Sequence, residues 1–360
     1  MTEKLLFKGN EAIAEAAIRA GCRYYFGYPI TPQNEIPEYM SRRMPKIGGI
    51  FLQAESEIAA INMVFGAGGS GVRVMTTTSS PGISLMQEGI SYLAGAEIPC
   101  VIVNVMRGGP GLGGIQPAQS DYFQATKGGG HGDYHCLVLG PSTLQELVEH
   151  VFLAFDLADK YRNPTIILTD GVMGQMMEPV EFPPEVDILK LSPKKWATTG
   201  ANGRKKIILK SLFLDPKELE NHNLHLQEKY NSMQEEIKWE EMNTKDCDLL
   251  LVAYGTAARV SKKAIEVAKE KNLSLGIFRP ITLYPFPYIQ LKDVIQNKKI
   301  KNILVVEMSM GQMIEDVKLA VEGEAPVGFY GRTGGVMPKV DEIIEKAESI
   351  LKVNTLKGVM

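Results

Sequence analysis

Residues 72–106 read VRVMTTTSSPGISLMQEGISYLAGAEIPCVIVNVM and predict a strand, a helix and a second strand in succession. The strands are expected at 72–77 and 99–106, and the helix is expected to begin at Pro81, directly after Ser80. Two strands separated by a helix of this length are typical of a β-α-β unit. The stretch therefore predicts a parallel sheet covered by helices.

The same alternation continues on both sides of this stretch. Further strands are expected at 24–27, 50–53, 136–139 and 165–169, and further helices from about residue 57 and at 142–160. Residues 1–185 are therefore predicted to form one α/β domain.

The second half of the chain changes in composition and then returns to the same pattern. Residues 186–245 contain prolines, small polar residues and a charged stretch with apolar residues at helical spacing, so they predict a linker that contains one amphipathic helix. Residues 246–360 predict a second α/β unit, with strands at 249–254, 275–278 and 303–307. The predicted fold class is α/β, with two doubly wound parallel-sheet domains.

Composition excludes several classes of partner and setting. The chain has 360 residues, 22% of them charged, and a net charge of −3, which gives no electrostatic footprint for nucleic acid or an anionic membrane. The longest strongly apolar run, 98–106, is far shorter than the roughly 20 residues that span a bilayer. The four cysteines form no C-x-x-C pair, so neither a disulfide framework nor a zinc or iron–sulfur site is predicted. A cytoplasmic location is expected.

Ligands of parallel α/β sheets bind beyond the carboxyl ends of the strands, and the loop after the strand at 24–27 is the first candidate. Its sequence is Tyr28-Pro29-Ile30-Thr31-Pro32. Thr31 is expected to be the N-cap of a helix that has Pro32 at its first position. The free N–H groups of such a helix start suit a carboxylate ligand, and a rigid capped turn without a ligand explains the residues equally well.

The second candidate loop contains Glu55 and Glu57 and leads into a helix that is apolar almost all round at 58–67. Such a helix is expected to be buried in the domain or in an interface. An acid at its start could share a proton with a ring nitrogen of a ligand. The alternative is that both glutamates only complement the helix dipole.

The third candidate is Arg107, at the end of the apolar strand, followed by the glycine-rich residues 108–114. A guanidinium at this position can hold a carboxylate with two parallel hydrogen bonds. Residues 109–114 also fit a dinucleotide-binding fingerprint, although Pro110 lies inside it and no clear helix follows. His131 and His135 have metal-ligand side chains, but the glycines around them indicate a flexible loop, and no metal is expected.

Four segments together resemble one family, the 2-oxoacid:ferredoxin oxidoreductases. Tyr28-Pro29-Ile30-Thr31-Pro32 is similar to the family's YPITP motif, and Ser56-Glu57 is similar to its Ser-Glu helix start. Arg107-Gly108-Gly109-Pro110 resembles the family's substrate-binding loop. Residues 249–360 look like its transketolase-type C-terminal domain, so residues 1–185 correspond to a domain that binds the pyrimidine of thiamine diphosphate.

The resemblance implies a role for each motif. Glu57 is implied to be the catalytic acid, hydrogen-bonded to the aminopyrimidine of thiamine diphosphate, and it is preferred over Glu55 because its flanking residues match the family's spacing. Thr31 and Arg107 are implied to hold the substrate carboxylate. The implied cofactor-binding residues are Tyr28, Pro29, Ile30 and Glu57.

The resemblance also implies partners, because the chain has no cluster-ligating cysteine motif and no magnesium–diphosphate motif. A beta subunit is expected to share the thiamine diphosphate site and to hold Mg²⁺. Ferredoxin-like subunits are expected to hold the iron–sulfur clusters and to pass electrons to an external ferredoxin. Coenzyme A is the expected co-substrate, and neither nucleic acid nor a membrane is an expected partner.

The tract GGIQPAQSDY at 113–122 looks most like the alpha chain of the family's branched-chain member. This implies oxidative decarboxylation of 2-oxoisovalerate to acyl-CoA and CO₂. The tract departs from the Thr- and Glu-containing loop of 2-oxoglutarate relatives. The alternatives are a 2-oxoglutarate:ferredoxin oxidoreductase alpha subunit, the beta chain of a lipoyl-linked branched-chain 2-oxoacid dehydrogenase, a nicotinamide-dependent dehydrogenase, and a non-catalytic scaffold.

Overall fold

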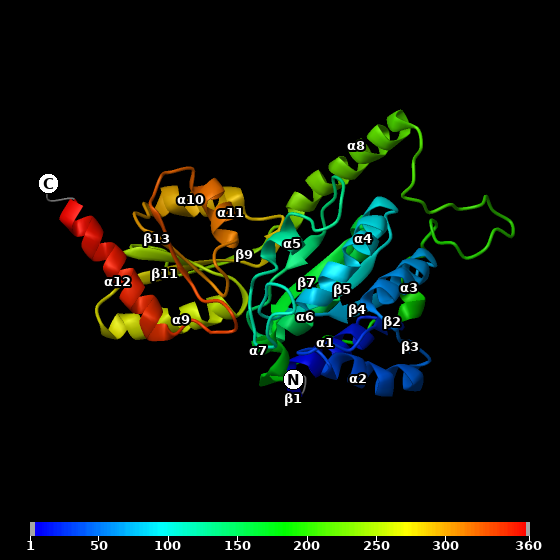
Figure 1. Ribbon diagram of the computed structural model, residues 1–360, viewed down its shortest axis with the longest axis horizontal. Helices are drawn as coiled ribbons and strands as arrows, with labels where there is room; N and C mark the ends of the chain where they lie inside the picture. The colour runs from blue at the N-terminus through cyan, green and yellow to red at the C-terminus, as the bar shows by residue number, and fades with distance from the viewer. Residues whose placement is uncertain (1–3, 358–360) are drawn as a thin grey trace.

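The computed structural model describes residues 4–357, which form two α/β units on separate sheets (Figure 1). The larger sheet has the strand order β12-β6-β7-β5-β4-β2-β3, and the smaller has the order β14-β13-β10-β11-β9. The central strands of both sheets pair in parallel, which confirms the predicted pair of doubly wound domains. The parallel strands of the larger sheet are β2 (Tyr24–Gly27), β3 (Ile50–Gln53), β4 (Val74–Thr78), β5 (Cys100–Met106), β6 (Leu137–Leu139) and β7 (Pro164–Asp170).

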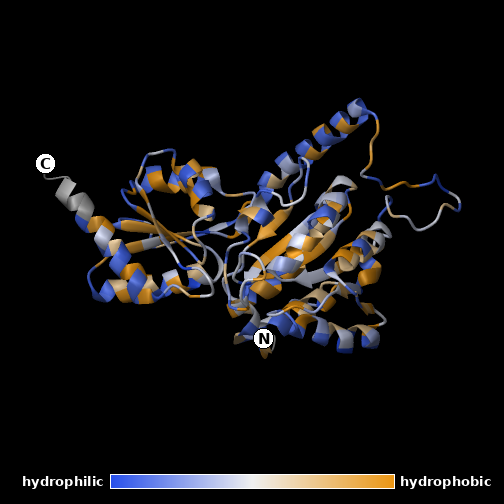
Figure 2. Ribbon diagram, viewed as in Figure 1, coloured by the Kyte–Doolittle hydropathy of each residue, from blue (hydrophilic) through white to orange (hydrophobic). Residues whose placement is uncertain are grey.

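Helices cover both faces of the larger sheet, whose central strands are largely hydrophobic (Figure 2). Along β5, side chains alternate between two hydrophobic cores. Val101, Val103 and Val105 pack on one face, whereas Ile102 and Met106 pack on the other. Burial of each such side chain contributes roughly 1.5–3 kcal/mol. The helices of the first face are α1 (Gly9–Arg19), α2 (Glu35–Arg43) and α6 (Leu144–Tyr161), and those of the second are α3 (Glu57–Gly69), α4 (Ser80–Gly95) and α5 (Tyr122–Thr126).

The smaller sheet is built in the same way. Its parallel strands are β10 (Leu249–Val252), β11 (Leu275–Pro280), β13 (Ile303–Glu307) and β14 (Val327–Gly331). One face is covered by α9 (Gly255–Glu270) and α12 (Val340–Lys357), and the other by α10 (Tyr288–Lys298) and α11 (Met313–Val321).

Short antiparallel strands link distant parts of the chain and were not predicted. β12 (Thr282–Tyr284) comes from the second half of the chain but joins the larger sheet, where it pairs with β6. β9 (Trp239–Met242) pairs with β11 in the smaller sheet. The segment 186–245 therefore contains α8 (Pro216–Ser232), which overlaps the stretch with apolar residues at helical spacing, and also one strand of the smaller sheet. The remaining elements are β1 (Leu5–Lys8), which pairs with β8 (Met177–Val180), together with α7 (Gly171–Gln175) and the 3₁₀ turns Met44–Ile47, Ile188–Lys190 and Met233–Glu236.

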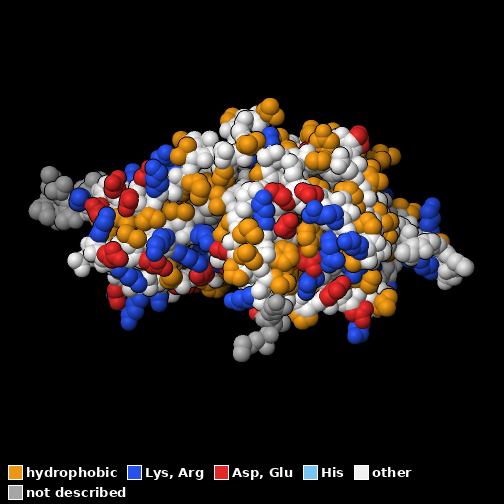
Figure 3. Space-filling view, turned by 90° about the horizontal axis from the view of Figure 1, so that it is seen from below, with side chains coloured by type: hydrophobic (Ala, Val, Ile, Leu, Met, Phe, Trp, Pro, Cys, Tyr) orange, Lys and Arg blue, Asp and Glu red, His pale blue; other side chains and the backbone are white. Residues whose placement is uncertain are grey.

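The surface mixes charge signs, as the composition predicts. Figure 3 shows Lys and Arg side chains interspersed with Asp and Glu over one face of the molecule. Within residues 4–357, no helix combines the length and the apolar composition needed to cross a bilayer.

A buried arginine joins the two domains. Arg279 of β11 is 1% exposed, and its Nε donates to Oε2 of Glu240 at 2.7 Å, while its Nη1 donates to Oε2 of Glu146 in α6 at 3.2 Å. Burial acts to raise the pKa of Glu146, but the attraction of Arg279 and His150 and the hydrogen bonds from the Ser142 N–H and from Arg279 together hold that pKa below its ordinary value of 4.5. Burial acts to raise the pKa of Glu240 as well, but the hydrogen bonds and the positive charges of Lys262 and Arg279 together lower it.

We expect Arg279→Met to lower the free energy of unfolding by about 3 kcal/mol, because it leaves two partly buried carboxylates without their shared cation. Carboxylates with lowered pKa values contribute stability above their ordinary pKa and lose it as the pH falls through the lowered values. Stability should therefore fall less steeply below about pH 4.5 in the variant than in the wild type. Urea denaturation at several pH values measures both effects.

The matched control is Arg42→Met, because Arg42 pairs with Glu38 at 2.9 Å on an exposed face of α2. An exposed pair of this kind contributes at most about 1 kcal/mol. Equal stabilities of the Arg279 and Arg42 variants would contradict a structural role for the buried cation.

Candidate active site

The three predicted loops meet at the carboxyl edge of the larger sheet. Nη1 of Arg107, at the end of β5, donates to the carbonyl oxygen of Thr31, beyond β2, at 3.0 Å. The first turn of α4 contacts the second and third loops. Its Ser80 hydroxyl accepts from the Arg107 N–H, and its Gly82 faces Glu57. The sequence placed these residues on separate loops, and parallel strand order brings the loops together.

The structure corrects the predicted role of Thr31 as a helix cap. Helix α2 begins at Glu35, after Asn34, so Thr31 lies in a turn closed by the Gln33 N–H, which donates to the Ile30 carbonyl at 3.0 Å. Its hydroxyl accepts from Asn34 Nδ2 at 3.4 Å. Thr31 is therefore held by the turn and by Arg107, and it offers no free helix start to an anion.

Gln33 fixes this turn to the sheet. Its amide nitrogen donates to the Tyr28 carbonyl at 3.3 Å, and its amide oxygen accepts from the Thr77 hydroxyl at 2.6 Å. Pro29 and Ile30 are half-buried between these anchors, and the Tyr28 side chain is exposed. The main chain at 28–31 is thus rigidly placed beside Arg107.

Glu57 is 5% exposed at the first position of α3, where the Ser56 hydroxyl caps the helix by accepting from the Ala59 N–H at 3.2 Å. Within the described part of the chain, its carboxylate has neither a hydrogen bond nor an ion pair. A mostly buried carboxylate that lacks a protein partner has its acceptor sites free for a ligand. Glu55 is exposed and accepts from Ser56 at 3.2 Å, which places it outside the site.

The space beside Glu57 depends on Gly82. A Cβ atom at residue 82 would lie 2.6 Å from Glu57 Oε1 and 2.0 Å from the Thr78 hydroxyl. The Thr78 and Ser79 hydroxyls, at the end of β4, are buried with no partner among the described residues. An acid and unpaired hydroxyls around a glycine fit a flat, polar heteroaromatic ring such as the aminopyrimidine of thiamine diphosphate.

Arg107 is 7% exposed, and its two Nη atoms donate to main-chain carbonyl oxygens. Nη2 donates to the Leu112 carbonyl at 3.1 Å, which closes the glycine-rich loop over the side chain. Its Nε is buried and has no partner among residues 4–357. A buried guanidinium with an unused N–H group is a strong site for a carboxylate.

Sequence reasoning missed three polar residues that surround the main chain of Arg107. The Ser80 hydroxyl donates to Asp121 Oδ2 at 2.5 Å, and Asn104 Nδ2 donates to the same oxygen at 2.9 Å. Burial raises the pKa of Asp121, and these two hydrogen bonds partly offset that rise. The sequence feature that could have revealed this cluster is Asn104, the one polar residue within the apolar strand CVIVNVM.

The glycine-rich loop does not have the geometry of a dinucleotide site. Gly113 has φ +59°, and a Cβ there would meet the Gly108 carbonyl oxygen at 1.9 Å, so the loop folds back on itself. The next helix, α5, begins only at Tyr122. No helix N-terminus therefore follows the fingerprint to receive a pyrophosphate.

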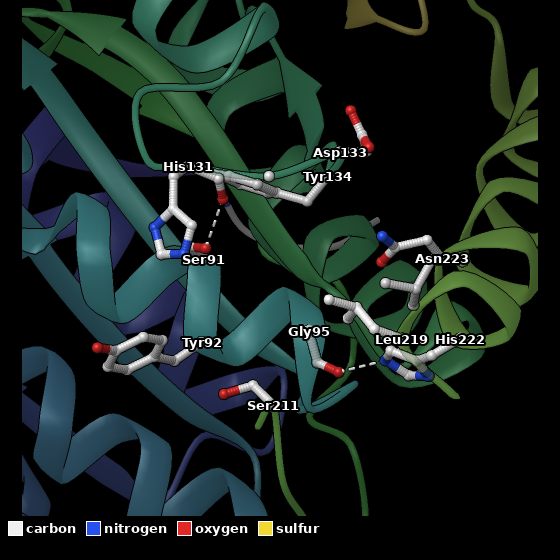
Figure 4. Close-up of a pocket in the computed structure, with 12 residues that line it drawn as sticks. Ser91, Tyr92, Gly95, His131, Asp133, Tyr134, Ser211, Leu219, His222 and Asn223 are labelled. Atoms are coloured by element: carbon white, nitrogen blue, oxygen red, sulfur yellow. Dashed lines mark hydrogen bonds between the residues drawn. The ribbon is translucent and has the colours of Figure 1, made fainter. Parts of the chain in front are cut away.

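The side chains of His131 and His135, which are of metal-ligand type, lie in different surroundings. His131 and His222 lie on opposite walls of a cavity of about 200 Å³ (Figure 4), where His222 Nε2 bonds to the Gly95 carbonyl at 2.7 Å. His135 instead stacks on the Tyr284 ring, with centroids 4.3 Å apart. Among the described residues, no group of three or more His, Cys, Asp or Glu side chains could hold a metal ion.

Large apolar side chains are exposed on the elements that carry the site. They come from the first loop, β3, α3, α4 and the glycine-rich loop, and they are Tyr28, Ile50, Leu52, Ile58, Leu85, Leu112 and Ile115. The helix expected to be apolar and buried is thus only partly covered by its own domain. Exposed apolar side chains gathered around a site indicate an interface with another chain.

The fold and the site together define a subunit of a thiamine diphosphate-dependent enzyme. Residues 15–245 match the family model for the thiamine diphosphate-binding domain of pyruvate flavodoxin/ferredoxin oxidoreductases, and residues 247–343 match the model for pyruvate:ferredoxin oxidoreductase core domain II. The chain belongs to the 2-oxoacid:ferredoxin oxidoreductase family, as its motifs predict.

Individual relatives agree with this assignment. The chain is 48% identical to the ketoisovalerate oxidoreductase subunit VorB of Methanothermobacter thermautotrophicus, over 96% of this chain and 97% of the relative. It is 34% identical to the 2-oxoglutarate synthase subunit KorA of Methanocaldococcus jannaschii, over 93% and 97% of the two chains. A solved 2-oxoglutarate:ferredoxin oxidoreductase from Magnetococcus marinus, with 2-oxoglutarate, coenzyme A and succinyl-CoA bound, superimposes with a TM-score of 0.84 at 26% identity, over 97% of this chain and 66% of that one.

Proposed function

We propose that this chain is the alpha subunit of an oxidoreductase that converts 2-oxoisovalerate and coenzyme A to a branched acyl-CoA and CO₂. The two electrons released per turnover pass to ferredoxin. The observation that most supports this reaction is the buried, unpartnered carboxylate of Glu57, which adjoins the first turn of α4, the same turn that contacts the main chain of Arg107.

Each group of the site has a distinct task in this proposal. Thiamine diphosphate supplies a carbon nucleophile for the keto carbon and accepts the electron pair that decarboxylation releases. Glu57 holds a proton at the ring nitrogen of the pyrimidine, in a pocket whose low dielectric strengthens that hydrogen bond. Tyr28, Pro29 and Ile30 form the wall of the cofactor site.

Substrate binding is assigned to the neighbouring loop. Arg107 attracts the carboxylate of the 2-oxo acid with charge-assisted hydrogen bonds, and the Thr31 hydroxyl adds a neutral one. Because both residues belong to one hydrogen-bonded unit, the carboxylate is held at a fixed distance from the cofactor wall, which favours the reactive orientation.

A beta subunit completes the site in this proposal. It covers the exposed apolar side chains around the loops and binds the diphosphate and Mg²⁺. Ferredoxin-like subunits hold the iron–sulfur clusters. Support comes from the relatives, which are subunits of oxidoreductases and synthases, and from the apolar surface that the chain leaves uncovered.

Sequence similarity supports the choice of substrate, because identity to the ketoisovalerate enzyme subunits is 48–49%, against 34–37% to the 2-oxoglutarate synthase subunits. We expect the complex, purified with its natural partner subunits, to reduce ferredoxin or a viologen dye with a kcat/KM at least about tenfold higher for 2-oxoisovalerate than for 2-oxoglutarate or pyruvate. The measurement is kcat/KM for each acid with coenzyme A present.

Two results would contradict parts of the proposal. A preference for 2-oxoglutarate would change the substrate but leave the reaction intact. Activity that requires a lipoyl acceptor, with no reduction of ferredoxin or viologen, would overturn the assignment as a ferredoxin-dependent enzyme.

A further inference from the structure

The residues that surround Asp121 are held by the second domain. The Gln119 N–H donates to the Met308 carbonyl at 2.8 Å, and the Met308 N–H donates back to Gln119 Oε1 at 3.0 Å. Gln119 Nε2 donates to the Tyr254 carbonyl at 2.9 Å. Gln119 is fully buried, and both the nitrogen and the oxygen of its side-chain amide bond to the second domain.

The residues on the other side of Asp121 are held in the same way. Gln312 Nε2 donates to the Ser120 carbonyl at 2.7 Å, and Gln312 Oε1 accepts from the Phe123 N–H at 2.8 Å. The Tyr122 hydroxyl donates to Asp316 at 2.6 Å. The segment 119–123 is therefore fixed by α11 and by the loops that follow β10 and β13, and it has little freedom of its own.

Asp121 faces the opposite direction, toward the first domain. Its Oδ2 accepts from the Ser80 hydroxyl and from Asn104 Nδ2. Ser80 Oγ in turn accepts from the Arg107 N–H at 3.0 Å, and the Ser80 N–H donates to Asn104 Oδ1 at 3.1 Å. The side chains of Asp121, Ser80 and Asn104 thus form a closed ring of hydrogen bonds, and Ser80 links this ring to the main chain of Arg107.

We propose that Asp121 is a positioning residue for substrate binding, through which the second domain fixes the main chain of Arg107 by way of Ser80. The inference rests on the proposed contact between Arg107 and the substrate carboxylate. It adds a role for the second domain, which otherwise contributes none of the proposed site residues.

Accurate placement matters because paired hydrogen bonds to a carboxylate require a well-oriented guanidinium. A displacement of about 1 Å from the reactive geometry can cost on the order of 100-fold in rate. A hydrogen bond that involves a charged group contributes roughly 1.5–3 kcal/mol, so Asp121 can hold Ser80 firmly despite the cost of burying its charge.

The test compares Asp121→Ala with Asp121→Asn in the complex purified with its partner subunits. Asn keeps an acceptor oxygen for Ser80 and Asn104, and Ala removes it. We expect D121A to raise KM for 2-oxoisovalerate about tenfold with kcat changed much less, and D121N to restore KM to within about threefold of the wild-type value. A D121N variant that loses kcat with an unchanged KM would overturn the positioning role, because the charge itself would then act in the reaction.

A double-mutant cycle with Arg107→Ala separates this inference from the proposed function. If Asp121 acts through Arg107, D121A has no further effect on KM in the R107A background, since interacting residues are non-additive. An equal effect of D121A in both backgrounds would overturn the inference and leave the Arg107 contact intact. An unchanged KM in R107A alone would overturn the proposed substrate contact itself.

Discussion

Glu57→Gln is expected to lower kcat for 2-oxoisovalerate by about 10²–10⁴-fold, the range that acid–base catalysis contributes. Gln preserves the shape of the side chain but cannot exchange a proton with the pyrimidine. The same change removes a buried charge that has no partner among the described residues, so we expect the free energy of unfolding of the cofactor-free protein to stay equal or to rise. Steady-state ferredoxin reduction and urea denaturation measure the two quantities.

The control is Glu55→Gln, which changes the same kind of side chain two residues away at an exposed position. It should leave kcat and stability within experimental error. Loss of activity in the Glu55 variant together with normal activity in the Glu57 variant would reverse the assignment of the catalytic acid. A stable, cofactor-binding E57Q variant with wild-type kcat would refute acid–base catalysis by this carboxyl group.

Local sequence patterns were sufficient to predict the parallel core. β2, β3 and β13 have the predicted boundaries, because each is an apolar run bounded by polar residues or glycine and pairs with neighbours of the same kind. β9 and β12 were missed because they are strands only through pairing with distant segments, β11 and β6. β12 is strand only because β6, more than 140 residues earlier in the chain, offers a free edge.

The same distinction applies to the site. The meeting of loops 28–32, 55–57 and 107–114 at one edge of the sheet could be predicted, since each loop follows a recognisable strand and parallel strands direct their ends to one edge. The Thr31 cap was wrong because Thr-Pro fits both a helix start and the turn that the structure contains. The positioning role of Asp121 could not be predicted, because it depends on hydrogen bonds to Ser80 and Asn104 and on a second domain that holds the neighbouring residues.

Arg107→Ala is expected to lower kcat/KM for every 2-oxo acid by about 10²–10³-fold, chiefly through KM. Hydrogen bonds to a charged group contribute roughly 1.5–3 kcal/mol each, and the substrate carboxylate would lose its cation in an environment with little water. Arg107→Lys should recover only part of this loss, because an ammonium group has the charge but lacks the planar pair of N–H donors. Initial rates at varied 2-oxoisovalerate, with coenzyme A saturating, give the two constants.

Arg107 also holds the Thr31 and Leu112 carbonyls, so a change of fold must be separated from a loss of substrate contact. Arg73→Ala provides the matched control. Arg73 is equally buried, at 7%, but binds Asp156 and Asp159 at the amino end of β4, away from the carboxyl edge. We expect R73A to destabilise the protein without raising KM, and R107A to raise KM with a smaller loss of stability. Parallel changes of KM in the two variants would show that loss of any buried arginine impairs the enzyme, and the assignment of Arg107 to the substrate would then fail.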